Sequence, residues 1–273
     1  MSILEAERVV PEREPKRLFE VTDRMLAALR RGGADLSQLG VPAPDEDEDF
    51  ELWEDVRVPQ ARARRLAWRN SMLEAAHGDY LKWRLADLDP GKGPTKLGYQ
   101  GSEELGGWLD SIVKAKKQRA RPSVMNFIVT GNIGSGKTTA LAALGNEASE
   151  RGLWVRFVKH ATYLAWRRPD GGPDGMSPYQ VRKRHVDEAD LLILDELCGE
   201  MDGVQTEFVR RETTDLIDSR LASGKPTAFS TNLRREGIVA VLGERLVSRM
   251  EDRAYLAKVV GPDRRAPRKP LDW

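Results

Sequence analysis

The chain has 273 residues, which is enough for one domain of ordinary size and a smaller second part. Hydrophobic residues make up 40% and charged residues 32%, and the mean hydropathy is -0.53, so the composition fits a chain that buries a core and excludes wholesale disorder. With 44 basic and 43 acidic residues the net charge is +1, which excludes a uniformly basic surface and leaves only local patches for contact with nucleic acid.

The sequence also limits where the protein works and which sites it can build. No apolar run approaches the ~20 residues that cross a bilayer, and the opening residues, MSILEAERVV, lack the basic start and apolar stretch of a signal peptide. We therefore expect a cytoplasmic protein without membrane contact. Cys198 is the single cysteine, which excludes an internal disulfide framework and a cysteine-rich zinc site.

Apolar residues at helical spacing predict a small helical module over residues 1–89. One helix is expected over 16–31, and a long helix or a broken pair over 60–88. The expected apolar stripe of the second helix consists of Leu66, Leu73, Ala76, Tyr80 and Trp83. Such a stripe forms internal core or, in part, a surface for a partner protein, and both interpretations stay open. The tryptophans Trp53, Trp68 and Trp83 are interpreted as packing residues.

Two segments after the first helix are expected to be linkers. The acidic run at 45–51, DEDEDFE, is interpreted as a solvated linker, with a dock for a basic surface as the alternative. Residues 90–101, PGKGPTKLGYQG, are rich in glycine and proline and predict the domain boundary.

Residues 102–273 are expected to form an α/β domain. Short apolar runs alternate there with helix-length segments, which indicates a mostly parallel five-stranded sheet flanked by helices. The predicted strands lie at 124–130, 153–158, 191–194, 227–231 and 255–260.

The strongest local signal is GNIGSGKT at 131–138, which satisfies the phosphate-loop pattern GxxxxGK[S/T] between a predicted strand and a predicted helix. Backbone N–H groups of such a loop surround phosphate oxygens, Lys137 reaches the β and γ phosphates, and the Thr138 hydroxyl binds Mg²⁺. The sequence therefore predicts ATP and Mg²⁺ as cofactors. The predicted nucleotide-binding residues are Gly131, Asn132, Ile133, Gly134, Ser135, Gly136, Lys137, Thr138 and Thr139.

Further chemical groups follow the later strands. LLILDE at 191–196 ends in two carboxylates, of which Asp195 is expected to hold Mg²⁺ and Glu196 to activate the attacking water. Asn232, after TAFST, is interpreted as a sensor of the γ-phosphate or as a helix cap. Arg245 and Arg249 share one helical face, which is a solvated surface or a source of an arginine finger for a neighbouring subunit.

The order GNIGSGKT, LLILDE, STN and GERLVSRM resembles the AAA+ ATPases of the DnaC/DnaI helicase-loader and IstB transposition-helper branch, over about residues 113–260. The resemblance implies a P-loop AAA+ fold of the ASCE type with ATPase activity. It implies that Asn232 is sensor one and that Arg249 is the arginine finger, with Arg245 beside it. Few residues follow the last predicted strand, so the lid is expected to be reduced or absent, and Arg264 or Arg265 is the candidate for sensor two.

Members of this branch bind DNA inside an ATP-dependent spiral. Cations and aromatic residues interleave after the second predicted strand, which suits contact with phosphates and bases, although packing of a helix on the sheet explains them equally well. These DNA-binding candidates are Lys159, Tyr163, Trp166, Arg167 and Arg168.

The expected function is an ATP-dependent helicase loader that assembles into an ATP-bridged oligomer. It would hold a hexameric, DnaB-type replicative helicase through residues 1–89 and deliver it onto single-stranded DNA. One alternative is an IstB-like transposition helper that binds duplex DNA and a transposase. Another is a nucleotide-responsive scaffold with little hydrolysis.

Overall fold

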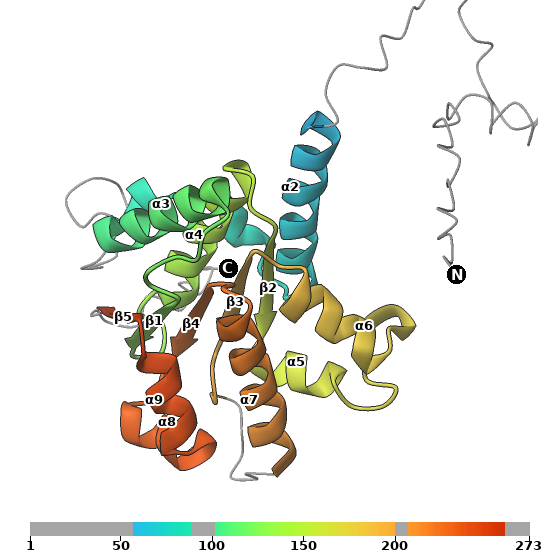
Figure 1. Cartoon of the computed structure of the whole chain (residues 1–273), viewed down its shortest axis with the longest axis vertical. Helices are drawn as coiled ribbons and strands as arrows, with labels where there is room; N and C mark the ends of the chain where they lie inside the picture. Colours follow the sequence, from blue (N-terminus) through green and yellow to red (C-terminus); the bar gives the residue numbers. More distant parts are fainter. Residues whose placement is uncertain (1–56, 89–101, 200–206, 260–273) are drawn as a thin grey trace, which may run out of the picture. The chain divides into compact units, whose positions relative to one another are not determined.

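The computed structural model describes residues 57–88, 102–199 and 207–259 (Figure 1). The helix expected over 16–31, Trp53, the acidic run at 45–51, the linker at 90–101 and the sensor-two candidates Arg264 and Arg265 lie outside the described residues. Residues Asp55–Trp273 form one compact unit.

A five-stranded parallel sheet forms the centre of this unit and confirms the predicted fold class. The strands are β1 (Asn126–Gly131), β2 (Val155–Lys159), β3 (Leu191–Asp195), β4 (Thr227–Thr231) and β5 (Ala254–Val259). Their order in the sheet is β2-β3-β4-β1-β5. The inner strands β1, β3 and β4 are buried along most of their length because both faces of the sheet are covered there, as expected for parallel sheets, whereas the edge strand β5 is largely exposed.

Helices cover the two faces of the sheet and enclose two hydrophobic cores (Figure 1). One face carries α2 (Arg57–Glu74), α3 (Ser102–Gln118) and α4 (Lys137–Glu150), with the 3-10 turns η2 (Gly78–Lys82) and η3 (Leu85–Leu88). The other face carries α5 (His160–Trp166), α6 (Pro178–Arg182), α7 (Glu207–Ala222), α8 (Arg235–Leu242) and α9 (Glu244–Glu251). A 3-10 turn, η4 (Pro173–Gly175), and a π-helical turn, η5 (Lys183–Asp187), connect α5 to β3.

Neighbouring strand residues divide between the two cores. Phe157 faces α2 and α4, whereas Val158, the next residue of β2, faces α5. This alternation follows from the two-residue period of a strand. Because the five strands are parallel, their carboxyl ends all lie at one end of the sheet, where the phosphate loop also begins.

The segment 57–88 packs on the sheet domain, although the sequence places it in the module at 1–89. Helix α2 ends near Ala76, whose φ of 58° is left-handed, so the broken alternative over 60–88 is correct. The predicted apolar stripe is wrong within α2, where Leu66 and Leu73 are 53% and 52% exposed and Trp68 and Met72 are buried instead. Its later members Tyr80 and Trp83 do pack against the first hydrophobic core. Trp68 and Trp83 both contact the first hydrophobic core, which agrees with their interpretation as packing residues.

Candidate functional site

The phosphate loop joins β1 to α4, and two of its glycines meet strict backbone demands. A Cβ atom on Gly131 would lie 2.4 Å from the carbonyl oxygen of Val259 in β5, so only glycine fits there. Gly136 has a φ of 103° and immediately precedes α4. The loop therefore brings backbone N–H groups to a helix N-terminus, which is a favourable place for an anion.

Polar groups of the loop point to the space that a phosphate needs. Lys137 Nζ donates to the carbonyl oxygens of Gly131 and Asn132, at 2.9 and 2.7 Å, so its ammonium group lies along the loop. The buried hydroxyl of Ser135 has no hydrogen-bond partner among the described residues. A phosphate oxygen would satisfy such a group, since buried polar atoms are normally hydrogen-bonded. Among the other predicted residues, Asn132 and Ile133 are exposed in the loop, and Thr139 is buried in the first turn of α4.

Asp195 lies opposite the loop, fully buried at the end of β3. Its Oδ2 accepts a hydrogen bond of 3.0 Å from Thr138 Oγ1, and its Oδ1 accepts one from Ser230. Burial raises the pKa of the Asp195 carboxyl, and the hydrogen bonds from Ser230 and Thr138 oppose that change.

These oxygen atoms fit a magnesium ion. Mg²⁺ prefers oxygen ligands and is commonly held by one or two side chains together with substrate phosphates. Thr138 and Asp195 supply a hydroxyl and a carboxylate at hydrogen-bond distance from each other. Within residues 57–88, 102–199 and 207–259, no group of three or more His, Cys, Asp or Glu side chains could hold a metal ion without help from a substrate.

Glu196 follows Asp195 with a left-handed φ of 55°. Its backbone N–H donates to Ser230 Oγ at 3.0 Å, and its Oε2 lies 3.4 Å from Lys159 Nζ at the end of β2. The proposed base is thus paired with a lysine in this structure. Because its Oε2 faces the ammonium group of Lys159, this ion pair has to open before Glu196 can contact an attacking water and act as a base.

Ser230 is a site residue that the sequence analysis missed. It connects the two acids, because its hydroxyl donates to Asp195 and accepts from the N–H of Glu196. The available signal was a serine inside the buried strand TAFST, one position after Phe229, which pairs with Leu194.

The predicted sensor and finger residues lie on the protein surface. Asn232 is exposed and directly follows β4, at the same sheet edge as the acids. Arg249 Nη1 donates to Asp218 Oδ2 of α7 at 2.5 Å, and Arg245 is exposed one helical turn before it on α9. The shared face of α9 agrees with the predicted spacing, and the roles of these three residues remain proposals.

The structure favours the packing interpretation for most of the DNA-binding candidates. Tyr163 is 0% exposed and cannot offer its ring to a base, and Arg167 is paired with Glu212 at 2.7 Å. Lys159 contacts Glu196, as described above. Trp166 is partly buried against His185, and exposed Arg168 lies 5.5 Å from the ring centre of Phe208.

In the described part of the chain no helix has both the length and the apolar composition to cross a membrane.

Comparisons with known proteins give several sequence relatives, among them proteins named replicative helicase loader DnaC. No protein-family model matches the chain. The replicative helicase loader DnaC of Escherichia coli K12 is 30% identical over 151 residues, which cover 54% of this chain and 59% of that protein. DnaC of Buchnera aphidicola subsp. Acyrthosiphon pisum is 26% identical over 144 residues, which cover 51% of this chain and 56% of that protein. The chain thus matches less than two thirds of the length of these relatives.

The fold has a solved counterpart. The crystal structure of DnaI superimposes with a TM-score of 0.52 at 19% identity, over 68% of this chain and 93% of DnaI. Besides the phosphate loop and the paired acids at the end of β3, the chain thus has sequence similarity to the replicative helicase loader DnaC and shares the fold of DnaI.

Proposed function

We propose that this protein is an ATP-dependent loader of a replicative helicase. The observation that carries the proposal is the contact between Thr138 and Asp195 across the phosphate loop, in a chain that is 30% identical to a protein named replicative helicase loader. A hydroxyl and a buried carboxylate at the start of the phosphate-loop helix are the protein ligands that a magnesium nucleotide needs.

The site residues divide the work of hydrolysis. The loop N–H groups and Lys137 bind the phosphates, and Thr138 and Asp195 hold Mg²⁺, which neutralises phosphate charge when bound. Glu196 accepts a proton from the attacking water once its ion pair with Lys159 has opened. Asn232 orients that water, and Arg249 acts on the site of a neighbouring subunit after leaving Asp218, with Arg245 beside it.

The partners belong to the same proposal. Residues 1–89 contribute the surface that holds a DnaB-type helicase, and copies of the chain assemble through ATP. A cytoplasmic location, where such a helicase works, is part of this proposal. The alternative function is that of a transposition helper, which binds a transposase and duplex DNA. The test below has to distinguish it from helicase loading.

For single-stranded DNA, α2 offers a surface that the sequence analysis did not consider. Arg62, Arg65 and Arg69 are exposed along one side of this helix, and the only acid of the helix, Glu74, is paired with Arg184. Substituting the three arginines with alanine should lower the salt dependence of DNA binding by about 0.7 per lost phosphate contact. Arg151→Ala is the matched control, because Arg151 is already paired with Asp110. An unchanged salt slope in the triple variant would remove α2 from the DNA surface.

Copurification tests the function as a whole. The intact chain is mixed with a replicative helicase or with a transposase, each with and without ATP, and the bound partner is measured. Lys137→Ala should abolish the effect of ATP, whereas Glu196→Gln should bind ATP and partner without turnover. Retention of a transposase but not of a helicase would overturn the loader function. If the wild type binds its partner in an ATP-dependent way but does not hydrolyse ATP, the protein is a nucleotide-responsive scaffold.

A further inference from the structure

The segment 57–88 lies along the edge of the sheet next to the nucleotide site. Ser71 Oγ of α2 accepts a hydrogen bond from the backbone N–H of Phe157 at 3.2 Å, and Arg156 donates to the carbonyl oxygen of Ala67 at 3.1 Å. Helix α2 thus provides hydrogen bonds to β2, the edge strand whose last residue is Lys159.

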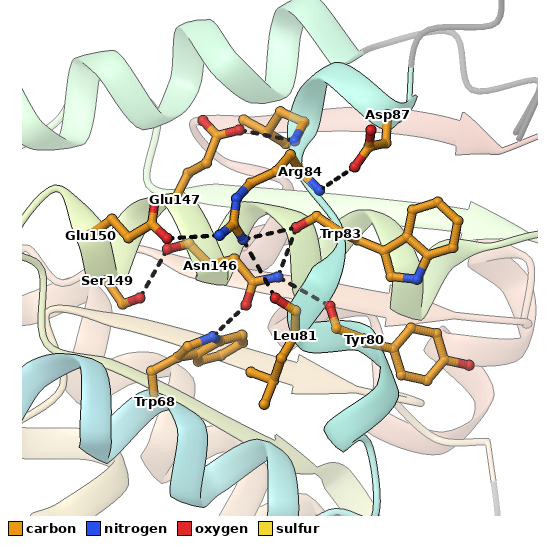
Figure 2. A network of polar contacts seen from close by, with 11 residues as sticks. Trp68, Tyr80, Leu81, Trp83, Arg84, Asp87, Asn146, Glu147, Ser149 and Glu150 are labelled. Carbon is orange, nitrogen blue, oxygen red and sulfur yellow. Dashed lines mark hydrogen bonds and ion pairs between the residues drawn. The ribbon is translucent and has the colours of Figure 1, made fainter. Parts of the chain in front are cut away.

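The same segment is hydrogen-bonded to the phosphate-loop helix α4 through Asn146 (Figure 2). Before His77, Trp68 Nε1 donates to Asn146 Oδ1 of α4 at 2.7 Å. After it, Asn146 Nδ2 donates to the carbonyl oxygens of Tyr80 and Trp83, at 3.0 and 2.8 Å. A single amide of α4 therefore fixes the chain on either side of His77.

His77 directly follows the left-handed residue Ala76, and its ring packs edge-on against Phe157 of β2. The ring centres are 5.3 Å apart. Phe157 and Lys159 are two residues apart in the strand, so they share one face of the sheet. Lys159 pairs with Glu196 through an ammonium-to-carboxylate distance of 3.4 Å. The His77 ring consequently lies on the side of β2 where this ion pair forms.

Two buried polar atoms at this place have no hydrogen-bond partner among the described residues. They are His77 Nε2 and Glu196 Oε2. Buried polar atoms without partners are rare in native proteins and call for an explanation. Burial lowers the pKa of His77, and the charges of Asp195, Lys159 and Glu196 also act on the ring. A neutral imidazole keeps one N–H donor, which is what a carboxylate oxygen accepts.

We propose that His77 is a positioning residue of the nucleotide site, which donates from Nε2 through one water to Glu196 and holds this carboxylate on Lys159. The ring thereby restrains hydrolysis, because Glu196 has to leave Lys159 to accept a proton from water. Segment 57–88 is part of residues 1–89, the region proposed to hold the helicase, so movement of this segment would release Glu196. This inference rests on the proposed ATPase function.

The kinetic experiment compares full-length wild type with three variants. His77→Phe keeps a ring against Phe157 but removes both nitrogens, and His77→Gln restores a donor near the position of Nε2. Asp79→Asn is the matched control, because Asp79 is exposed in the same turn. His77→Phe should raise kcat about tenfold, the rate equivalent of one hydrogen bond to a charged group, and should leave the KM for ATP within about twofold. His77→Gln and Asp79→Asn should behave like the wild type.

A second measurement does not depend on turnover. Long-range ¹H–¹⁵N spectra resolve the ring nitrogens of the three histidines, and buried His160 and His185 serve as internal references. Glu196→Gln should shift the His77 signals and leave the other two in place. Unshifted His77 signals, or a kcat that is unchanged or lower in His77→Phe, would overturn the inference. Absence of hydrolysis in the wild type would instead refute the ATPase function, and the spectra would still test the contact.

Discussion

Replacing Gly145 with alanine tests whether segment 57–88 is packed on α4 as described. A Cβ atom at position 145 would lie 2.2 Å from Cη2 of Trp68. Carbon atoms in contact are about 3.5–4.0 Å apart, so the indole has to move by more than about 1 Å. Overpacking of this kind costs about 1–3 kcal/mol, and a displaced Trp68 loses a hydrogen bond to Asn146 worth about 1 kcal/mol. Against this, alanine is favoured over glycine inside a helix by about 0.8–1.0 kcal/mol.

The expected net result for Gly145→Ala is a loss of about 1–3 kcal/mol in the free energy of unfolding, measured by urea denaturation. The control is the same substitution in a Trp68→Ala background. There the steric cost is gone and only the helix preference remains, so Gly145→Ala should stabilise by up to about 1 kcal/mol. A Gly145→Ala variant that is more stable than the wild type while Trp68 is present would refute the packing of α2 on α4.

The remaining predictions concern buried ionisable side chains. Burial lowers the pKa of His160 to about 4 and of His185 to about 3, so below about pH 6.5 the unfolded chain binds protons that the folded chain does not. The free energy of unfolding should therefore fall as the pH drops from about 6.5 to 4, and His185→Phe should make this fall shallower in urea titrations; a stability that is constant over this range would contradict the assignment. Arg220 is buried and donates to five oxygen atoms, so Arg220→Met should cost about 3–5 kcal/mol in urea denaturation, and a cost below about 1 kcal/mol would be evidence against these contacts. Burial also raises the pKa of Asp195, so Asp195→Asn should stabilise the nucleotide-free chain and remove the rise in melting temperature that Mg²⁺ and ATP give the wild type; a variant that keeps this rise would remove Asp195 from the magnesium site.

The sequence predicted the sheet well because its signals are local. Each strand lies in a short apolar run between helix-length segments, and the phosphate loop is recognised from a single stretch of eight residues, GNIGSGKT. Asp195 was found for the same reason, since a carboxylate at the end of a buried strand is visible in the sequence.

The contacts that depend on tertiary packing were not predictable. Periodicity alone did not show which side of α2 faces the protein. Trp68 is buried because Gly145, a residue far away in the sequence, has no side chain and leaves room for the indole ring. Ser230 and His77 became candidates only when β4 and the end of α2 were seen beside the acids. A histidine 118 residues before Asp195 (195 − 77) carries no signal of that neighbourhood in its own stretch of sequence.

The strand order affects how the protein folds during its synthesis on the ribosome. Strand β1 pairs with β4 and β5, which are both synthesised after it, and Gly131 rests against Val259 near the end of the described chain. A nascent chain that has emerged only as far as α4 therefore contains GNIGSGKT but lacks β4 and β5, the strands that flank β1 and the phosphate loop. Nucleotide can assist only the late steps of folding, and chains stalled before residue 254 should not be retained on an ATP resin.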